Sequence, residues 1–173
     1  QFGVIGLSVM GKNLALNVKN HGYSVSGFSI DKPEVDALAK YEDKNLKPAY
    51  TWEEFVNSLE KPRKILIQIM AGKPVDETLQ KLLPLLDKGD ILIDGGNSNF
   101  HDTNRRYKEM EKHGIHFIGM GVSGGEEGAL NGPALMPGGD EKAYEEVAPI
   151  LEAMAAKTPT GQPCVGYIGP AGS

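Results

Sequence analysis

A glycine-rich turn near the start of the chain has the residue types that bind a diphosphate. The segment Gly6-Leu7-Ser8-Val9-Met10-Gly11 follows the apolar run of residues 2–5 and precedes a helical pattern beginning near Leu14. A turn between a strand and a helix allows close backbone approach and offers unpaired N–H groups. The usual fingerprint is G-x-G-x-x-G, and Ser8 stands at its middle glycine. The turn predicts a dinucleotide site, although similar turns also occur in proteins that bind no nucleotide.

Four residues at the end of the second expected strand bear on which dinucleotide would bind. Ser29, Ile30, Asp31 and Lys32 follow the strand pattern of residues 23–28. An acid placed about 20 residues beyond the glycine turn, as Asp31 is, accepts the ribose hydroxyls of NAD, whereas a cation is needed for the 2′-phosphate of NADP. Lys32 is a local cation, and Asp31 equally fits the cap of a helix. We expect NAD to be favoured over NADP.

Two later segments combine glycine with neutral polar side chains. Asp94-Gly95-Gly96-Asn97-Ser98 follows one expected strand, and residues 121–139 follow the next. The side chains of Asn97 and Ser123 offer hydrogen bonds, and Gly124-Gly125 offers open backbone N–H groups, which together suit a polyhydroxy carboxylate. We expect residues 121–139 to form a long functional loop, with a purely structural glycine loop as the alternative.

The elements that would position these residues alternate along the chain. Short apolar runs predict strands at residues 2–5, 23–28, 65–69, 91–93, 115–118 and 164–168. Helical patterns lie between them, near residues 14–20, 33–41, 51–59, 75–86, 103–113 and 140–151. Continuous apolar strands between helices predict an α/β, Rossmann-like, doubly wound and mostly parallel sheet with helices on both faces. We expect one domain over residues 1–173.

Composition excludes several classes of protein. The net charge is −5 over 173 residues and neither sign forms a long block, so a nucleic-acid partner is not expected. The apolar runs are far shorter than the roughly 20 residues that span a bilayer. The single Cys164 allows neither an internal disulfide nor a cysteine metal site, which fits a cytoplasmic protein. Glu126-Glu127 is interpreted as an exposed pair in a loop rather than as a metal site.

On these motifs the chain resembles the 6-phosphogluconate dehydrogenase (decarboxylating) family, within the wider group of β-hydroxyacid dehydrogenases. The resemblance extends along the whole chain and is carried by residues 6–17, 58–63, 88–97, 122–139 and 163–169. It corresponds to the family's amino-terminal coenzyme-binding domain. It implies oxidative decarboxylation of 6-phosphogluconate to ribulose 5-phosphate, with a nicotinamide coenzyme taking the hydride.

The resemblance also implies site residues. The substrate would be held by Asn97, Ser123, Gly124 and Gly125. The coenzyme would be bound by Gly6, Leu7, Ser8, Val9, Met10, Gly11, Ser29, Ile30, Asp31, Lys32, Met70, Ala71 and Asn97. Family members that use NADP carry Asn-Arg-Ser/Thr where this chain has Ser29, Ile30 and Asp31, and Met70 stands where Lys or Gln is usual. The missing arginine again favours NAD over NADP, with weakened binding of both coenzymes as the alternative.

The family's catalytic Lys and Glu would lie beyond Ser173, in a helical domain, so we expect no catalytic residue and negligible turnover in this chain. The parent enzyme would be a homodimer. Two alternatives are kept. One is another β-hydroxyacid dehydrogenase, such as a hydroxyisobutyrate-type enzyme. The other is a dinucleotide-binding module without enzymatic activity.

Overall fold

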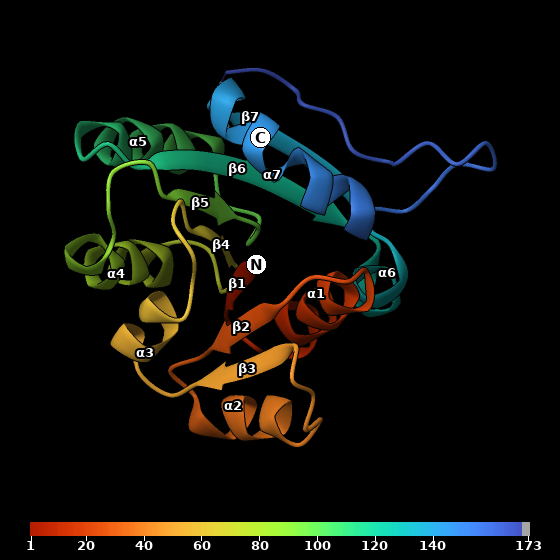
Figure 1. Ribbon diagram of the computed structural model, residues 1–173. Coiled ribbons are helices and arrows are strands. Elements are labelled where there is room, and N and C mark those ends of the chain that lie inside the picture. Colours follow the sequence, from red (N-terminus) through yellow and green to blue (C-terminus); the bar gives the residue numbers. More distant parts are fainter. Residues whose placement is uncertain (171–173) are drawn as a thin grey trace.

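The computed structural model describes residues 1–170 and contains a seven-stranded sheet (Figure 1). The strands are β1 (Phe2–Ile5), β2 (Val25–Phe28), β3 (Leu46–Ala49), β4 (Lys64–Ile67), β5 (Ile91–Asp94), β6 (His116–Ser123) and β7 (Ala134–Gly139). Their spatial order is β3-β2-β1-β4-β5-β6-β7, with β7 antiparallel to β6 and the other pairs parallel. This confirms the doubly wound, mostly parallel sheet. The predicted domain, residues 1–173, includes residues 171–173, which lie outside the described part.

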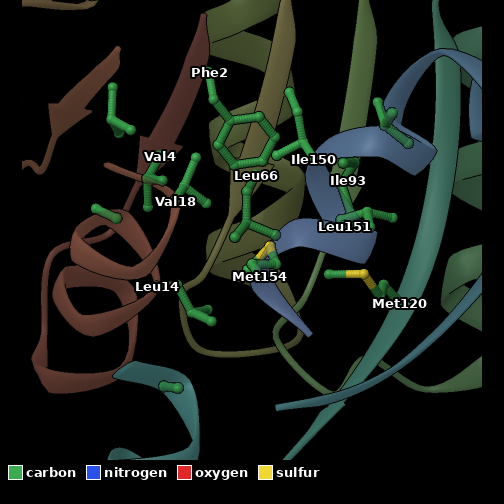
Figure 2. Packing of buried hydrophobic residues seen from close by; sticks show 14 of the residues in the cluster. Phe2, Val4, Leu14, Val18, Leu66, Ile93, Met120, Ile150, Leu151 and Met154 are labelled. Carbon is green, nitrogen blue, oxygen red and sulfur yellow. The ribbon is translucent and has the colours of Figure 1, made fainter. Parts of the chain in front are cut away.

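Helices cover both faces of the sheet, as predicted. They are α1 (Val9–Asn20), α2 (Lys32–Ala39), α3 (Trp52–Asn57), α4 (Lys73–Leu82), α5 (Phe100–Lys112), α6 (Gly125–Asn131) and α7 (Glu141–Met154). Side chains of α1, α2, α6 and α7 share one core, and those of α3, α4 and α5 share the other. Successive residues of β4 serve opposite cores: Leu66 packs in the first, beside Leu151 and Met154 of α7 (Figure 2), and Ile65 packs in the second. Burial on both faces explains why the strand is continuously apolar.

One strand is absent from the sequence predictions and one predicted strand is wrong. Strand β3 forms an edge of the sheet, where Pro48 is tolerated because an edge strand has N–H positions that need no partner. The strand predicted at residues 164–168 does not form; this segment makes an isolated bridge between Val165 and Leu135 and single backbone bonds to β7. Cys164, the first residue of this segment, is partly exposed.

The loop predicted over residues 121–139 is also wrong. The segment contains the end of β6, all of α6 and all of β7. Its glycines permit close packing rather than irregular backbone: a Cβ at Gly139 would lie 2.6 Å from the carbonyl oxygen of Phe117 on the paired strand. A high glycine content was therefore compatible with a regular antiparallel pair.

Two helix boundaries differ from the sequence pattern for local reasons. Helix α5 begins at Phe100 rather than near residue 103, because the side chain of Asn99 accepts a hydrogen bond from the N–H of His101 and caps the helix. The pattern at residues 75–86 divides into α4 and a 3-10 turn, Leu83–Leu85, which contains Pro84. Proline has no N–H for a helical bond, so the α-helix ends before it.

Candidate coenzyme-binding site

The candidate site lies where the order of the sheet reverses. From β1 the chain proceeds outward to β2 and β3, and from β4 it proceeds the other way to β5 and β6. Ligands of open parallel sheets bind at the carboxyl ends of the strands beside such a switch point. Two cavities lie there, of about 350 and 230 Å³, and Ile69 and Met70 line both. The first is lined further by residues of α4 and by Gly6, Ser29 and Ile30, which directly follow β1 and β2. The second is lined by residues including Ser8, Met10 and Asn97.

The glycine turn has space for backbone and none for side chains. Gly6 has a φ of +91°, and a Cβ there would lie 2.3 Å from the carbonyl oxygen of Gln68. A Cβ at Gly11 would lie 1.8 Å from the carbonyl oxygen of Gly6. Real Cβ atoms do not approach oxygen so closely, so both positions need glycine. The turn is thus held tightly between β1 and β4.

The N-terminus of α1 is open to an anion. Ser8 is the exposed N-cap residue, and its side chain makes no capping hydrogen bond. The N–H of Lys12 bonds to the carbonyl of Ser8, so the N–H groups of Val9, Met10 and Gly11 precede the first helical bond. The arrangement fits a diphosphate, because the helix dipole and these donors both favour negative charge.

The four residues that follow β2, residues 29–32, which were predicted to bind the coenzyme, have different environments in the structure. Ser29 is buried, and its hydroxyl accepts a hydrogen bond from the N–H of Asp31 at 3.1 Å. Ile30 is 85% exposed and lines the larger cavity. Asp31 is the N-cap residue of α2, as predicted, but its side chain makes no capping hydrogen bond. The ammonium group of Lys32 donates a hydrogen bond to Asp36 at 2.9 Å. The positive charge of Lys32 is therefore paired with a carboxylate of its own helix.

Sequence reasoning missed Glu34, which the fold brings to the glycine turn. Its Oε2 accepts hydrogen bonds from the hydroxyl of Ser29 at 2.6 Å and from the N–H of Leu7 at 3.2 Å. Leu7 was predicted among the coenzyme-binding residues, and this contact engages its N–H. Glu34 lies in the first turn of α2, and the one signal that could have found it is an acid close behind the second strand.

Sequence reasoning also missed Gln68, at the end of β4. Its side chain lines the smaller cavity, and within residues 1–170 its Oε1 is buried with no hydrogen-bond partner. A Cβ at Gly95 would lie 2.4 Å from this oxygen, so the glycine after β5 leaves room for the amide. Met70, two residues further, is 78% exposed between the two cavities, and Ala71 follows it. A buried amide oxygen without a partner is uncommon in folded proteins.

The predicted substrate residues come from two neighbouring strand ends. Asn97 lines the smaller cavity and has a φ of +59°. Val122 of β6 lines the same cavity, and Ser123, Gly124 and Gly125 follow it as exposed residues at the end of β6 and the start of α6. The structure therefore places the two segments at one edge of the sheet, with Asn97 inside the cavity and the other three beyond its lining.

A buried arginine organises the segment that carries Asn97. Arg106 of α5 has no exposed side-chain surface and donates hydrogen bonds to Asp76 at 2.9 Å, to the hydroxyl of Ser98 and to the carbonyl of Gly72. Asp94, at the end of β5, accepts hydrogen bonds from the Ser98 hydroxyl and from the N–H of the residue between them, Gly96. Two charged groups and a hydroxyl thus fix the backbone around Asn97.

The hydrogen bond from Arg106, assisted by one from Arg105, lowers the pKa of Asp76 from 3.8 to about 2. Because the folded pKa is the lower one, the unfolded chain binds more protons between these values, and stability falls as pH falls through this window. We expect Asp76→Asn to lose about 1 kcal/mol at pH 6, after allowance for partial exposure, and less near pH 3. Urea unfolding of both proteins at the two pH values measures this, and an equal loss at both would contradict it.

Other residues singled out in the sequence do not join this site. Glu126 and Glu127 are exposed as predicted, but they lie in the first turn of α6 and not in a loop. Among residues 1–170, no group of three His, Cys, Asp or Glu side chains is placed to hold a metal ion. In the same residues, the helices are too short or too polar to cross a membrane.

Comparison with known proteins gives the family. Residues 1–169 match the family model described as the NAD binding domain of 6-phosphogluconate dehydrogenase. The whole chain is 61% identical over 174 residues to 6-phosphogluconate dehydrogenase, decarboxylating, of Staphylococcus aureus (strain Mu50 / ATCC 700699). The chain spans 37% of the length of that relative.

Solved structures give the same result. A 6-phosphogluconate dehydrogenase of Plasmodium falciparum, described in its apo form, with its cofactor NADP+ and with its substrate 6-phosphogluconate, is 40% identical with a TM-score of 0.93. The match covers 99% of this chain and 37% of that one. A 3-hydroxyisobutyrate dehydrogenase of Salmonella typhimurium, at 19% identity, a TM-score of 0.80 and coverage of 99% and 57%, shares the fold. The chain belongs to the 6-phosphogluconate dehydrogenase family, of which it forms the NAD(P)-binding domain.

Proposed function

We propose that this chain, over residues 1–173, is the coenzyme-binding domain of a cytoplasmic, homodimeric enzyme of the pentose phosphate pathway. That enzyme oxidatively decarboxylates 6-phosphogluconate to ribulose 5-phosphate and CO2 while it reduces NAD(P). The observation that carries the proposal is the glycine turn at the switch point, where Gly6 and Gly11 exclude any Cβ beside the open N-terminus of α1. The cytoplasmic location is supported by the single cysteine, which leaves no internal disulfide.

The proposed roles follow the order of the strand ends. The turn of residues 6–11 binds the diphosphate, and residues 29–32 face the adenosine ribose. Met70, Ala71 and Asn97 contact the nicotinamide half, since they follow β4 and β5 on the other side of the switch point. Asn97, with Ser123, Gly124 and Gly125, holds the hydroxyl and carboxylate groups of the substrate.

The nicotinamide, when bound, would accept a hydride from the substrate carbon that bears a hydroxyl group and lies β to the carboxylate. Oxidation there produces a β-keto acid, whose carbonyl accepts the electron pair released when CO2 departs. The chain's own part is to bind and orient: the donors at α1 fix the diphosphate, and the side chain of Asn97 fixes a substrate oxygen. We assign neither the general base for the hydroxyl proton nor the acid for the enol to a residue of this chain.

We further propose that NAD is preferred over NADP. Ile30, exposed at the end of β2, offers no charge to a 2′-phosphate, and the neighbouring Asp31 is a carboxylate. Lys32 is a cation in this segment, but its ammonium bonds to Asp36, whose second partner is the hydroxyl of Tyr50 at 2.7 Å. A 2′-phosphate would therefore meet net negative charge, which opposes its binding.

Calorimetric titration of the chain with NAD and with NADP, with and without 6-phosphogluconate, tests this function. We expect NAD to bind about tenfold tighter than NADP or more, a difference of about 1.4 kcal/mol. Lys32→Met serves as a control and is expected to change the ratio less than about threefold. Tighter binding of NADP by the wild type, with a loss confined to NADP in Lys32→Met, would show that Lys32 holds the phosphate and would contradict the preference.

A further inference from the structure

The carboxylate nearest to the glycine turn comes from α2 and not from the end of β2. Glu34 Oε2 lies 3.2 Å from the backbone nitrogen of Leu7 and 2.6 Å from the hydroxyl of Ser29. These donors belong to two different strand ends, β1 and β2, which are paired in the sheet. The Glu34 carboxylate is therefore fixed between the turn proposed for the diphosphate and the strand end proposed for the adenosine ribose.

The surroundings hold this carboxylate in place. Ser29 is 8% exposed, so its hydroxyl donates within a largely water-free contact, and the same oxygen accepts the N–H of Asp31. The chain of bonds from Asp31 N–H through Ser29 to Glu34 aligns donors in one direction, which strengthens each bond. By contrast, the side chain of Asp31 makes no capping bond, and the residue is exposed.

We infer that Glu34 is the residue that selects a coenzyme without a 2′-phosphate. A carboxylate accepts hydrogen bonds from vicinal ribose hydroxyls and repels a phosphate dianion at the same position. The nearby Lys32 does not compensate, because it pairs with Asp36 on the same helix. The inference rests on the proposed function, since it needs a dinucleotide at the turn, and it moves the selecting role from Asp31 to Glu34.

The test is calorimetric titration of NAD and NADP into the wild-type chain and into Glu34→Gln, Glu34→Asp and Asp31→Asn. Glu34→Gln is expected to weaken NAD binding about tenfold and to leave NADP binding unchanged or tighter, because the amide retains the shape but loses the charge. Glu34→Asp keeps the charge and is expected to retain a preference for NAD. Asp31→Asn removes the competing carboxylate of the same site and is expected to change the NAD to NADP ratio less than Glu34→Gln does, because the Asp31 side chain is exposed and makes no capping bond.

The results distinguish a failure of the role of Glu34 from a failure of the proposed function. A wild type that prefers NAD, together with a ratio that responds to Asp31→Asn and not to Glu34→Gln, overturns the role of Glu34 and leaves the proposed function standing. A wild type that binds neither coenzyme overturns both. A wild type that prefers NADP overturns the role of Glu34 and the preference for NAD, and leaves the proposed coenzyme-binding function standing. Thermal unfolding of each variant identifies a folding defect. If Glu34→Gln does not fold, Glu34→Asp is compared with Asp31→Asn instead. A NAD to NADP affinity ratio that changes in Asp31→Asn alone then overturns the inference.

Discussion

Replacing Gly11 by alanine is expected to lower the free energy of unfolding by about 3 kcal/mol and to weaken NAD binding at least tenfold. The added Cβ would lie 1.8 Å from the carbonyl oxygen of Gly6, and this contact is with backbone, which cannot rotate away as a side chain can. The turn and the first residues of α1 must then separate. Because these residues carry the proposed diphosphate donors, stability and affinity are expected to fall together.

Urea unfolding and calorimetric titration of Gly11→Ala measure the two effects. Gly128→Ala is the matched control, since Gly128 lies within α6 and a Cβ there meets no atom within 4 Å. Alanine is favoured over glycine inside a helix, so this control is expected to keep or slightly raise the stability. Unfolding and NAD affinity of Gly11→Ala that match those of the wild type would contradict the proposed tight turn.

Replacing Arg106 by methionine is expected to cost about 3–5 kcal/mol of stability, which is the range for removing one partner of a buried ion pair. Its side chain has no exposed surface, and Asp94, 3.6 Å away, is 2% exposed. The variant leaves Asp94 charged without its cation and removes donors to Ser98 and to the carbonyl of Gly72. The segment that carries Asn97 is then expected to lose its fixed conformation.

Arg105→Met is the matched control for this variant. Arg105 adjoins Arg106 and pairs with the same Asp76, but its side chain is 50% exposed. Pairs of this kind contribute about 0–1 kcal/mol, so a small loss is expected. Urea unfolding compares the two variants, and equal losses would show that burial of Arg106 does not set its contribution. Arg106→Lys, which keeps the charge but not the planar set of donors, is expected to fall between them.

Local patterns in the sequence were sufficient for most of the architecture. Strands such as β4 are recognisable because both faces are buried, which demands apolar residues at successive positions, as in Ile65-Leu66-Ile67. The glycine turn is recognisable because Gly6 and Gly11 are required by backbone geometry, whatever surrounds them. Signals of this kind arise within a few residues and do not depend on distant contacts.

The sequence predictions were wrong where the residue pattern of an element is weak, or where the same residues fit more than one structure. Strand β3 carries Lys47 and Pro48 at an edge of the sheet, where one side needs no partner, so its residues alternate poorly. In residues 121–139, glycine indicated a loop, although glycine also permits the close pairing of β6 and β7. Residues 164–168 have strand-forming side chains, yet they lie along β7 with isolated bonds.

Residue types at short spacing were enough to predict the doubly wound sheet, the glycine turn between β1 and α1, and the family. Which side chains meet at the candidate site depended on how the helices pack against the sheet. Packing of α2 against the sheet brings Glu34 to Leu7, and packing of α5 brings Arg106 to the end of β5. The physical reason is that a side chain's partners depend on where whole elements dock, and contacts 27 residues apart, such as Leu7 with Glu34, leave no local pattern.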